Sequence, residues 1–229
     1  QGADAAAVLS PASLADWVKA AADGLGMKAV GTLSVFDDVD GAGITLPTVG
    51  PDDLCYLQFS SGSTRFPLGV AVTQKALMAN AHAITHHGLE ITAADRCVSW
   101  LPLYHDMGLV GFLLTPLVCQ VSIDYLPTRE FARRPLLWLN IITRNGGTLS
   151  YSPSFGYELA ARRAETASTE GIDLSTWRGA GIGGDMVRPR VLRKFIDAFA
   201  PRGFRPGALV PSYGMAEAAL ALSFAPLGD

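Results

Sequence analysis

The strongest constraint on the fold of this chain is the regular alternation of short apolar segments with segments of helical periodicity. The apolar segments have the length of strands, and helical patterns lie between most of them. Such alternation predicts an α/β fold with a mainly parallel sheet flanked by helices, in which ligands bind where loops leave the strand ends. The predicted strands lie at 54–58, 69–72, 97–101, 121–125, 148–151, 209–212 and 221–224, with a Gly-dense strand and loop over 179–185. The predicted helices lie at 74–87, 107–117, 135–142, 155–164 and from 189 onward.

One loop between two predicted strands is dense in hydroxyl groups, and it runs Ser60, Ser61, Gly62, Ser63, Thr64, Arg65. Successive backbone N–H groups and hydroxyls can hold an anion, and Gly62 supplies a permissive backbone. The functional interpretation is a phosphate cradle, and the structural alternative is an ordinary Ser/Gly turn. It is not a Walker loop, because the Gly-Lys-Ser/Thr ending is absent and a strand follows it. After that strand, Thr73 is predicted to cap a helix that begins at Gln74.

Two further motifs follow predicted strands, Trp100-Leu101-Pro102-Leu103-Tyr104-His105-Asp106-Met107-Gly108 and Pro211-Ser212-Tyr213-Gly214-Met215-Ala216-Glu217. Together with the hydroxyl-rich loop, and in this order, they resemble the core motifs of the adenylate-forming enzymes, which activate carboxylic acids with ATP. The likeness is greatest to the fatty acyl-AMP ligases and extends from about residue 53 to residue 224. It implies part of the N-terminal domain of that fold. It also implies that a medium- or long-chain fatty acid and ATP would give an acyl-adenylate and pyrophosphate.

The resemblance implies a nucleotide and metal site. The 60–65 loop would clamp the β- and γ-phosphates of ATP, and the Tyr213 ring would pack on adenine. Glu217 would act in catalysis by holding Mg²⁺, a hard cation that bridges phosphate oxygens through few carboxylates. Without the motif, Glu217 would be interpreted as a surface residue and Tyr213 as the cap of a core. The remaining nucleotide contacts would come from Gly183, Gly184, Asp185, Gly214, Met215 and Ala216.

The resemblance also implies a site for the fatty acid. His105 would lie near the carboxylate of the acid as a catalytic residue, although a lone loop histidine is usually structural. The apolar helix predicted from Met107 would line a hydrophobic pocket on one side, and it would also be part of the core. The residues assigned to substrate binding are Trp100, Met107, Gly108 and Gly111, and the two glycines would leave room for the acyl chain.

The departures from the superfamily pattern leave alternatives open. Most members have Thr-Gly-x-Pro-Lys-Gly where this chain has Thr64-Arg65-Phe66-Pro67-Leu68-Gly69. Fatty acyl-AMP ligases share the Arg and often lack the Lys, so the resemblance implies transfer of the acyl group to an acyl carrier protein or polyketide synthase. A long-chain acyl-CoA ligase is the nearest alternative. A non-catalytic module that binds an acyl chain or carrier protein is another, which the missing Lys at Leu68 favours slightly.

The charge, apolar runs and cysteines of the chain limit which partners and surroundings it can have. The net charge is −3 and no basic run is present, which argues against nucleic acid as a partner. The longest apolar run, 107–119, contains Pro116 and is shorter than the roughly 18 residues that a membrane span needs. The cysteines at 55, 97 and 119 lack metal-site spacing, so they are expected to be buried free thiols in a reducing, cytoplasmic compartment.

The extent of the likeness predicts one partial domain over residues 1–229. The later Thr-Gly-Asp motif, the hinge and the C-terminal lid domain with its catalytic lysine have no counterpart here, so the chain alone is expected to be inactive. Hydrophobic residues make up 49% of it, as expected if missing parts normally cover some surface. Residues 1–12 are expected to be loose, followed by a helix, a short strand near 30–36 and an exposed connection over 37–53.

Overall fold

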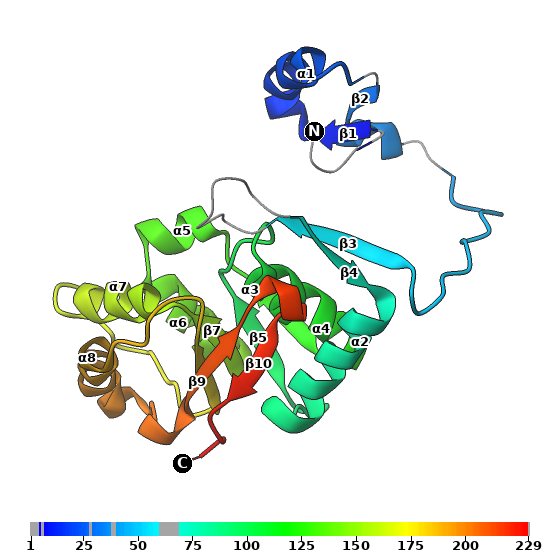
Figure 1. Cartoon of the computed structure of the whole chain (residues 1–229). Helices are drawn as coiled ribbons and strands as arrows, with labels where there is room; N and C mark the ends of the chain where they lie inside the picture. The colour runs from blue at the N-terminus through cyan, green and yellow to red at the C-terminus, as the bar shows by residue number, and fades with distance from the viewer. Residues whose placement is uncertain (1–4, 6, 28, 38–39, 60–68, 229) are drawn as a thin grey trace.

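The computed structural model describes residues 5, 7–27, 29–37, 40–59 and 69–228, and its centre is a six-stranded sheet (Figure 1). The strands follow the order β10-β9-β8-β7-β5-β6, and all neighbours are parallel except β9 and β10. The predicted mainly parallel sheet is therefore confirmed. The strand bounds are β5 Arg96–Ser99, β6 Ser122–Tyr125, β7 Leu149–Ser152, β8 Gly179–Ile182, β9 Leu209–Gly214 and β10 Ala221–Phe224.

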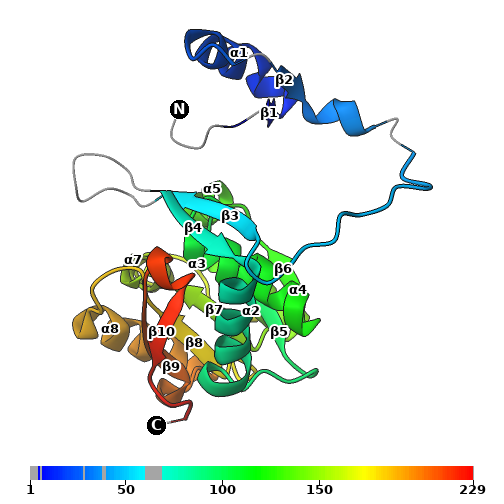
Figure 2. The same ribbon diagram turned by 45° about the vertical axis from the view of Figure 1, so that its right-hand side comes forward.

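Helices cover both faces of the sheet, as a parallel sheet requires. Helices α6, α7 and α8 lie on one side, and α2, α3 and α4 lie on the other (Figures 1 and 2). Among the described helices, none has the combination of length and apolarity that crossing a bilayer requires. The bounds are α2 Gln74–Ala83, α3 Asp106–Leu109, α4 Thr115–Cys119, α5 Thr128–Arg133, α6 Leu136–Asn145, α7 Ser154–Ala164 and α8 Pro189–Phe199, with π-helical turns at Ile84–Gly88 and Val110–Leu114.

A layer of aromatic rings fills the space between the sheet and helices α6 to α8. The Trp138 and Trp177 rings meet edge to face with centroids 5.1 Å apart, and Tyr157 meets Phe195 at 5.0 Å. The buried polar atoms of these rings have partners on the sheet: Trp138 Nε1 donates to Ser150 Oγ at 2.8 Å, and the Tyr157 hydroxyl donates to the carbonyl of β8 at 2.9 Å. The aromatic rings on this face of the sheet are thus densely packed, and the polar atoms of Trp138 and Tyr157 are hydrogen-bonded.

A separate antiparallel hairpin, β3 Leu54–Phe59 with β4 Gly69–Thr73, leads into α2. Thr73 caps that helix as predicted, because its Oγ1 accepts a hydrogen bond from the backbone N–H of Ala76 at 3.2 Å. The interpretation of 54–58 as a buried strand is wrong, since Leu54 is 54% exposed and Leu57 36%. The reason is that a two-stranded ribbon outside the main sheet has one face without a covering layer.

The N-terminal segment has more structure than its sequence predicts. Residues 1–12 were expected to be loose, but β1 Ala7–Ser10 pairs in parallel with β2 Ala29–Thr32, and α1 Ala15–Gly24 lies between them. The strand expected at 30–36 is shorter, because its second half forms a 3₁₀ turn over Leu33–Phe36. A non-local strand pairing of this kind is not visible in local sequence periodicity.

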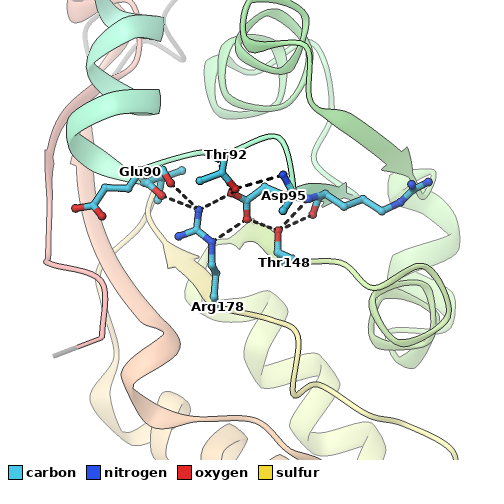
Figure 3. A network of polar contacts seen from close by, with 8 residues as sticks. Glu90, Thr92, Asp95, Thr148 and Arg178 are labelled. Atoms are coloured by element: carbon cyan, nitrogen blue, oxygen red, sulfur yellow. Dashed lines mark hydrogen bonds and ion pairs between the residues drawn. The ribbon is translucent and has the colours of Figure 1, made fainter.

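The amino ends of three neighbouring strands are joined by one partly buried ion pair and its hydrogen bonds (Figure 3). Arg178, just before β8, donates from Nη2 to Asp95 Oδ2 at 2.7 Å and from Nε to Asp95 Oδ1 at 2.8 Å. Thr148, just before β7, donates from its hydroxyl to Asp95 Oδ1 at 2.7 Å. Arg178 Nη2 also donates to the carbonyl of Leu89 at 2.9 Å and to that of Glu90 at 3.0 Å. The network therefore fixes segment 89–95 against the amino ends of these strands.

These contacts determine the ionisation of Asp95. Burial alone would raise its pKa, but the hydrogen bonds from Arg178, from the Thr148 hydroxyl and from the backbone N–H of Thr92 outweigh burial and lower the pKa to about 2. Because the folded pKa lies below the unfolded one, the ionised carboxylate stabilises the fold above about pH 4, and that stabilisation is lost as the pH falls toward 2.

We predict that Asp95→Asn lowers the free energy of unfolding at neutral pH by about 2 kcal/mol, because a charge-assisted bidentate contact with Arg178 becomes a weaker neutral one. Denaturant titrations at several pH values measure this. The difference between wild type and variant should shrink as the pH falls from 4 toward 2. A difference that stays constant over this range would contradict the assigned pKa.

Candidate functional site

A cavity of about 220 Å³ lies on the other face of the sheet, between the strands and helices α2 to α4. Its polar end is formed where β8 and β9 end and α3 begins. Its inner end is formed by residues near the amino ends of β5 and β7. The lining residues are Ile84, Leu89, Ile91, Cys97, His105, Asp106, Met107, Gly111, Phe112, Thr115, Pro116, Leu149, Tyr151, Gly183, Gly184, Ser212, Tyr213, Gly214, Leu220, Ala221 and Phe224.

At the polar end, the backbone of two glycines packs closely against neighbouring residues. A Cβ on Gly183 would lie 3.2 Å from the carbonyl oxygen of Ser212 and 3.8 Å from the sulfur of Met107. Gly184 has φ +77°, a left-handed conformation that other residues rarely adopt. Larger residues at 183 and 184 would fill the space beside Met107. The two glycines therefore keep a slot open at the carboxyl end of β8.

His105 and Asp106 are in contact at this polar end. His105 Nδ1 lies 2.7 Å from Asp106 Oδ1. The backbone N–H of Met107 donates to the same carboxylate oxygen at 2.7 Å and also lies 3.3 Å from His105 Nδ1. The hydrogen bond with Asp106 raises the pKa of His105 and outweighs burial, which lowers it. When Nδ1 carries a proton and donates it to Asp106, the ring offers a second N–H donor, at Nε2, only as the imidazolium. The pair is thus suited to bind a carboxylate in the protonated state of the ring.

Tyr213 and Gly214 form the end of β9 and the start of a tight turn into β10. The Tyr213 side chain lines the cavity and is 63% exposed, so its ring is available for stacking. Gly214 admits the close approach of β10, because a Cβ there would lie 2.0 Å from the Leu220 carbonyl oxygen. Ala219 closes the turn with φ +66°, a strained value for a non-glycine residue. Glu217 is exposed on the 3₁₀ turn Ala216–Ala218 within it.

The interior of the cavity is apolar, and both π-helical turns contribute to it. Ile84 begins the first turn, and Phe112 lies within the second. Such turns are rare and often occur at functional sites. Cys97, on β5, lines the inner end, and burial raises the pKa of its thiol to about 12, so it behaves as an apolar group. Helix α2 is joined to β10 by Asn80, whose side-chain amide exchanges two hydrogen bonds with the backbone of Ala221 at 2.8 and 3.0 Å.

The cavity brings together predicted residues from both halves of the expected site. Those of the nucleotide side and those of the acid side share one continuous lining, although they come from segments far apart in the sequence. The predicted residues that line it are His105, Met107, Gly111, Gly183, Gly184, Tyr213 and Gly214.

Other predicted residues lie outside that lining. Trp100 is 2% exposed and stacks on Phe131 with ring centroids 3.8 Å apart, so it belongs to the core. At Gly108 a Cβ would lie 2.2 Å from the carbonyl oxygen of Pro102, which means that the glycine makes room for backbone. Asp185 Oδ1 accepts from the backbone N–H of Ser154 at 2.9 Å and so caps the start of α7. Met215, Ala216 and Glu217 form the turn after β9, and Ser60, Ser61, Gly62, Ser63, Thr64 and Arg65 lie outside the described residues.

Sequence reasoning missed several lining residues. Asp106 could have been found, because a carboxylate next to the motif histidine is an obvious partner for it. Tyr151, whose hydroxyl oxygen lies 3.1 Å from that of Ser212 across the sheet, gave no local signal. Neither did Thr115, which looks like one more residue of an apolar helix.

No group of three or more His, Cys, Asp or Glu side chains in the described part of the chain is arranged to hold a metal ion. Glu217 alone, exposed on its turn, suits a cation such as Mg²⁺ that takes most of its ligands from substrate phosphates and water.

The sequence matches a known protein family over nearly its whole length. The model of the family described as AMP-binding enzyme matches residues 6–229. The chain belongs to this family.

The relatives of this AMP-binding chain include ligases with different acceptors. A Caulobacter vibrioides protein with the provisional name acyl-CoA synthetase is 57% identical over 228 residues, which cover 100% of this chain and 40% of that protein. A medium-chain fatty acid–acyl carrier protein ligase of Moorena producens is 39% identical, over 77% of this chain and 30% of its own length. A solved structure from a study of fatty acyl-adenylate ligases of E. coli and L. pneumophila matches with a TM-score of 0.91 and 45% identity, over 97% of this chain and 40% of that one. The chain thus spans about 30 to 40% of these relatives and has the fold of their AMP-binding domain.

We predict that Asp106→Asn lowers the pH at which the His105 ring loses its proton, because the hydrogen bond to a carboxylate, the main cause of the raised pKa, is removed. Asn keeps an oxygen that can accept from the Met107 N–H, so the start of α3 should be preserved. Titration of the ring protons by NMR measures the effect, and His105→Gln assigns the resonance. An unchanged midpoint would show that Asp106 does not control the ring.

Proposed function

We propose that this chain provides the acid and adenylate site of an enzyme that activates a fatty acid with ATP. The carboxylate would attack the α-phosphorus, form a C–O–P linkage and release pyrophosphate. The observation that supports this most is the shape of one cavity, which runs from a polar, glycine-lined end to an apolar interior. An acyl-adenylate is an amphiphile with the same order of parts. The family match and the ligase relatives support the same reaction class.

The acid would bind with its carboxylate at His105. In the imidazolium form, Nε2–H can donate to the carboxylate, while Asp106 keeps Nδ1–H in place. Catalysis of this reaction needs mainly positioning and charge neutralisation. We therefore expect the affinity for the acid to fall as the pH rises through the raised pKa of His105.

The acyl chain would extend into the apolar interior. Phe112 and Leu149 are largely buried members of the apolar lining there. Each buried methylene would contribute about 0.8 kcal/mol to binding.

The nucleotide would occupy the polar end. We assign the adenine face to Tyr213 and the slot beside it to Gly183 and Gly184, with Gly214, Met215 and Ala216 in the adjoining turn. Asp185 would lie next to this slot, and its carboxylate contacts the start of α7. Glu217 would hold Mg²⁺, which neutralises charge on the phosphates. The loop 60–65, outside the described residues, remains the proposed phosphate cradle.

Three sequence motifs indicate which molecule would accept the acyl group. The Arg65 motif and the form of the 100–108 and 211–217 segments favour an acyl carrier protein or polyketide synthase, and the Moorena relative is named as a carrier protein ligase. Coenzyme A is the second candidate, because the Caulobacter relative carries a synthetase name. Adding each acceptor to the complete enzyme with preformed acyl-adenylate distinguishes the two, since only the true acceptor consumes it.

We predict that this chain binds a non-hydrolysable decanoyl-adenylate analogue in the presence of Mg²⁺ and that Tyr213→Ala weakens binding about tenfold, since stacking of a base on an aromatic ring contributes about 1–3 kcal/mol. Tyr213→Phe should retain most of the affinity. Tyr104→Ala is a matched control, because Tyr104 is 84% exposed and is not among the residues that line the cavity. Calorimetric titration measures all four proteins. Equal weakening by Tyr104→Ala would show that the assignment of Tyr213 is wrong.

We predict that Glu217→Gln, made in a protein that contains the complete domain, lowers fatty-acid-dependent exchange of pyrophosphate into ATP by about a hundredfold or more, because the metal loses its carboxylate ligand. Asp185→Asn, whose carboxylate contacts the start of α7, is the matched control and should retain exchange within a few-fold. A protein without exchange activity before mutation would support the binding-only alternative.

A further inference from the structure

Strand β8 presents two glycines, Gly179 and Gly181, to side chains that cross it from the neighbouring strand β7. A Cβ atom on Gly179 would lie 2.6 Å from Leu149 Cδ2, and one on Gly181 would lie 2.0 Å from ring carbons of Tyr151. Leu149 and Tyr151 both line the cavity. Because β8 has no Cβ at these two positions, the side chains of β7 form the floor of the cavity on the side of the sheet.

The direction of Tyr151 follows from the alternation of side chains along β7. The preceding residue, Ser150, accepts a hydrogen bond from Trp138 Nε1 at 2.8 Å and therefore points into the aromatic layer under helices α6 to α8. Successive side chains of a strand point to opposite faces, so Tyr151 points to the face where the cavity lies. Its ring meets that of Phe112, another lining residue, with centroids 6.0 Å apart.

The Tyr151 ring is fixed along its whole length. Its Cε1, Cζ and Cε2 atoms lie 2.0, 2.0 and 2.1 Å from the position of a Cβ on Gly181, so the ring lies face-on over that glycine. Ser212 Oγ donates to the carbonyl of Val210 at 3.0 Å, so the Tyr151 hydroxyl is the donor in its 3.1 Å contact with Ser212 Oγ. The side chain thus starts on β7, crosses β8 and is attached to β9.

We propose that Tyr151 sets the width of the acyl part of the cavity and makes the site selective for unbranched acyl chains over acids that carry a ring. This inference rests on the proposed function. The ring occupies the space that Gly181 leaves over the sheet, and Phe112 meets it from the helical segment on the opposite wall. A packed ring that is held at both ends yields to a wider ligand only with strain, and an unbranched chain is the narrowest acyl group.

The first test compares four non-hydrolysable acyl-sulfamoyl-adenosine probes: decanoyl, 3-phenylpropanoyl, 5-phenylpentanoyl and 7-phenylheptanoyl. In calorimetric titrations the whole chain should bind the decanoyl probe most tightly. Tyr151→Ala removes the ring. It should raise the affinity for at least one phenyl probe, relative to decanoyl, by about tenfold, as expected when an overpacked group gains space. The three phenyl positions sample different depths of the cavity.

Three further variants separate the width of the ring from a general loss of stability. Tyr151→Phe keeps the ring and loses only the hydroxyl bound to Ser212, so it should keep the wild-type ranking of the probes. Tyr151→Leu removes less volume and should give a smaller gain of the same kind, which preserves the test if Tyr151→Ala does not fold. Phe195→Leu is the matched control, because Phe195 is 0% exposed, packs on Tyr157 in the aromatic layer and does not line the cavity. It should lower Tm without changing the ranking.

The second test uses the contact beneath the ring. Gly181→Ala places a Cβ within 2.0 Å of the Tyr151 ring, which must then move toward the cavity. We expect the affinity for the decanoyl probe to fall by about tenfold or more. In the Tyr151→Ala background the same substitution meets no ring and should change the affinity little. If Gly181→Ala alone does not fold, the double variant should fold, as circular dichroism would show.

The results separate this inference from the proposed function. Binding of the decanoyl probe to the wild-type chain, with no gain for any phenyl probe in Tyr151→Ala, would overturn the role of Tyr151 and leave the proposed function intact. An equal effect of Gly181→Ala with and without the Tyr151 ring would also overturn that role. Failure of all four probes to bind the wild-type chain would overturn both.

Discussion

The ion pair between Asp95 and Arg178 is the contact on which the arrangement of the site depends. It joins the amino ends of β5, β7 and β8, and through the carbonyls of Leu89 and Glu90 it fixes the segment that follows the first π-helical turn. Leu89 and Ile91 of that segment line the inner end of the cavity. Because the Asp95 carboxylate is buried, separating it from Arg178 would leave an uncompensated buried charge, so the pair resists displacement. The closed end of the cavity is therefore held by the same contact that aligns the strands.

The two faces of the sheet differ in how they are packed. On one face, the rings of Trp138, Trp177, Tyr157 and Phe195 fill the space at close range and satisfy their polar atoms on the strands. On the other face, two helices contain π-helical turns and leave a cavity of about 220 Å³. A densely packed layer resists deformation, so it can support an open site on the opposite face. The parallel order of β5, β7, β8 and β9 then places their carboxyl ends, with His105, Gly183 and Tyr213, at one end of that cavity.

Local patterns predicted much of the fold because periodicity, capping and glycine or proline positions act over a few residues. The cap at Thr73, the helix that starts at Pro189 and the strand 221–224 all follow from such signals. Helix α5, Thr128–Arg133, was not predicted, since it is short and has little apolar periodicity. The pairing of β1 with β2 and the exposure of β3 were also missed. These depend on contacts between distant segments, which local periodicity does not contain.

The sequence by itself determined the class of fold, the order of its motifs and the family resemblance, because these are properties of residue types and their spacing. Only the tertiary structure decided which motif residues meet. It placed His105, Met107, Gly183 and Tyr213 around one cavity, and it assigned Trp100 to the core and Gly108 to a backbone contact. It also placed the ring of Tyr151 face-on over Gly181, on the floor of that cavity. The physical reason is that burial, hydrogen-bond satisfaction and cavity shape depend on which distant side chains pack together, and neighbouring residues along the chain do not specify this.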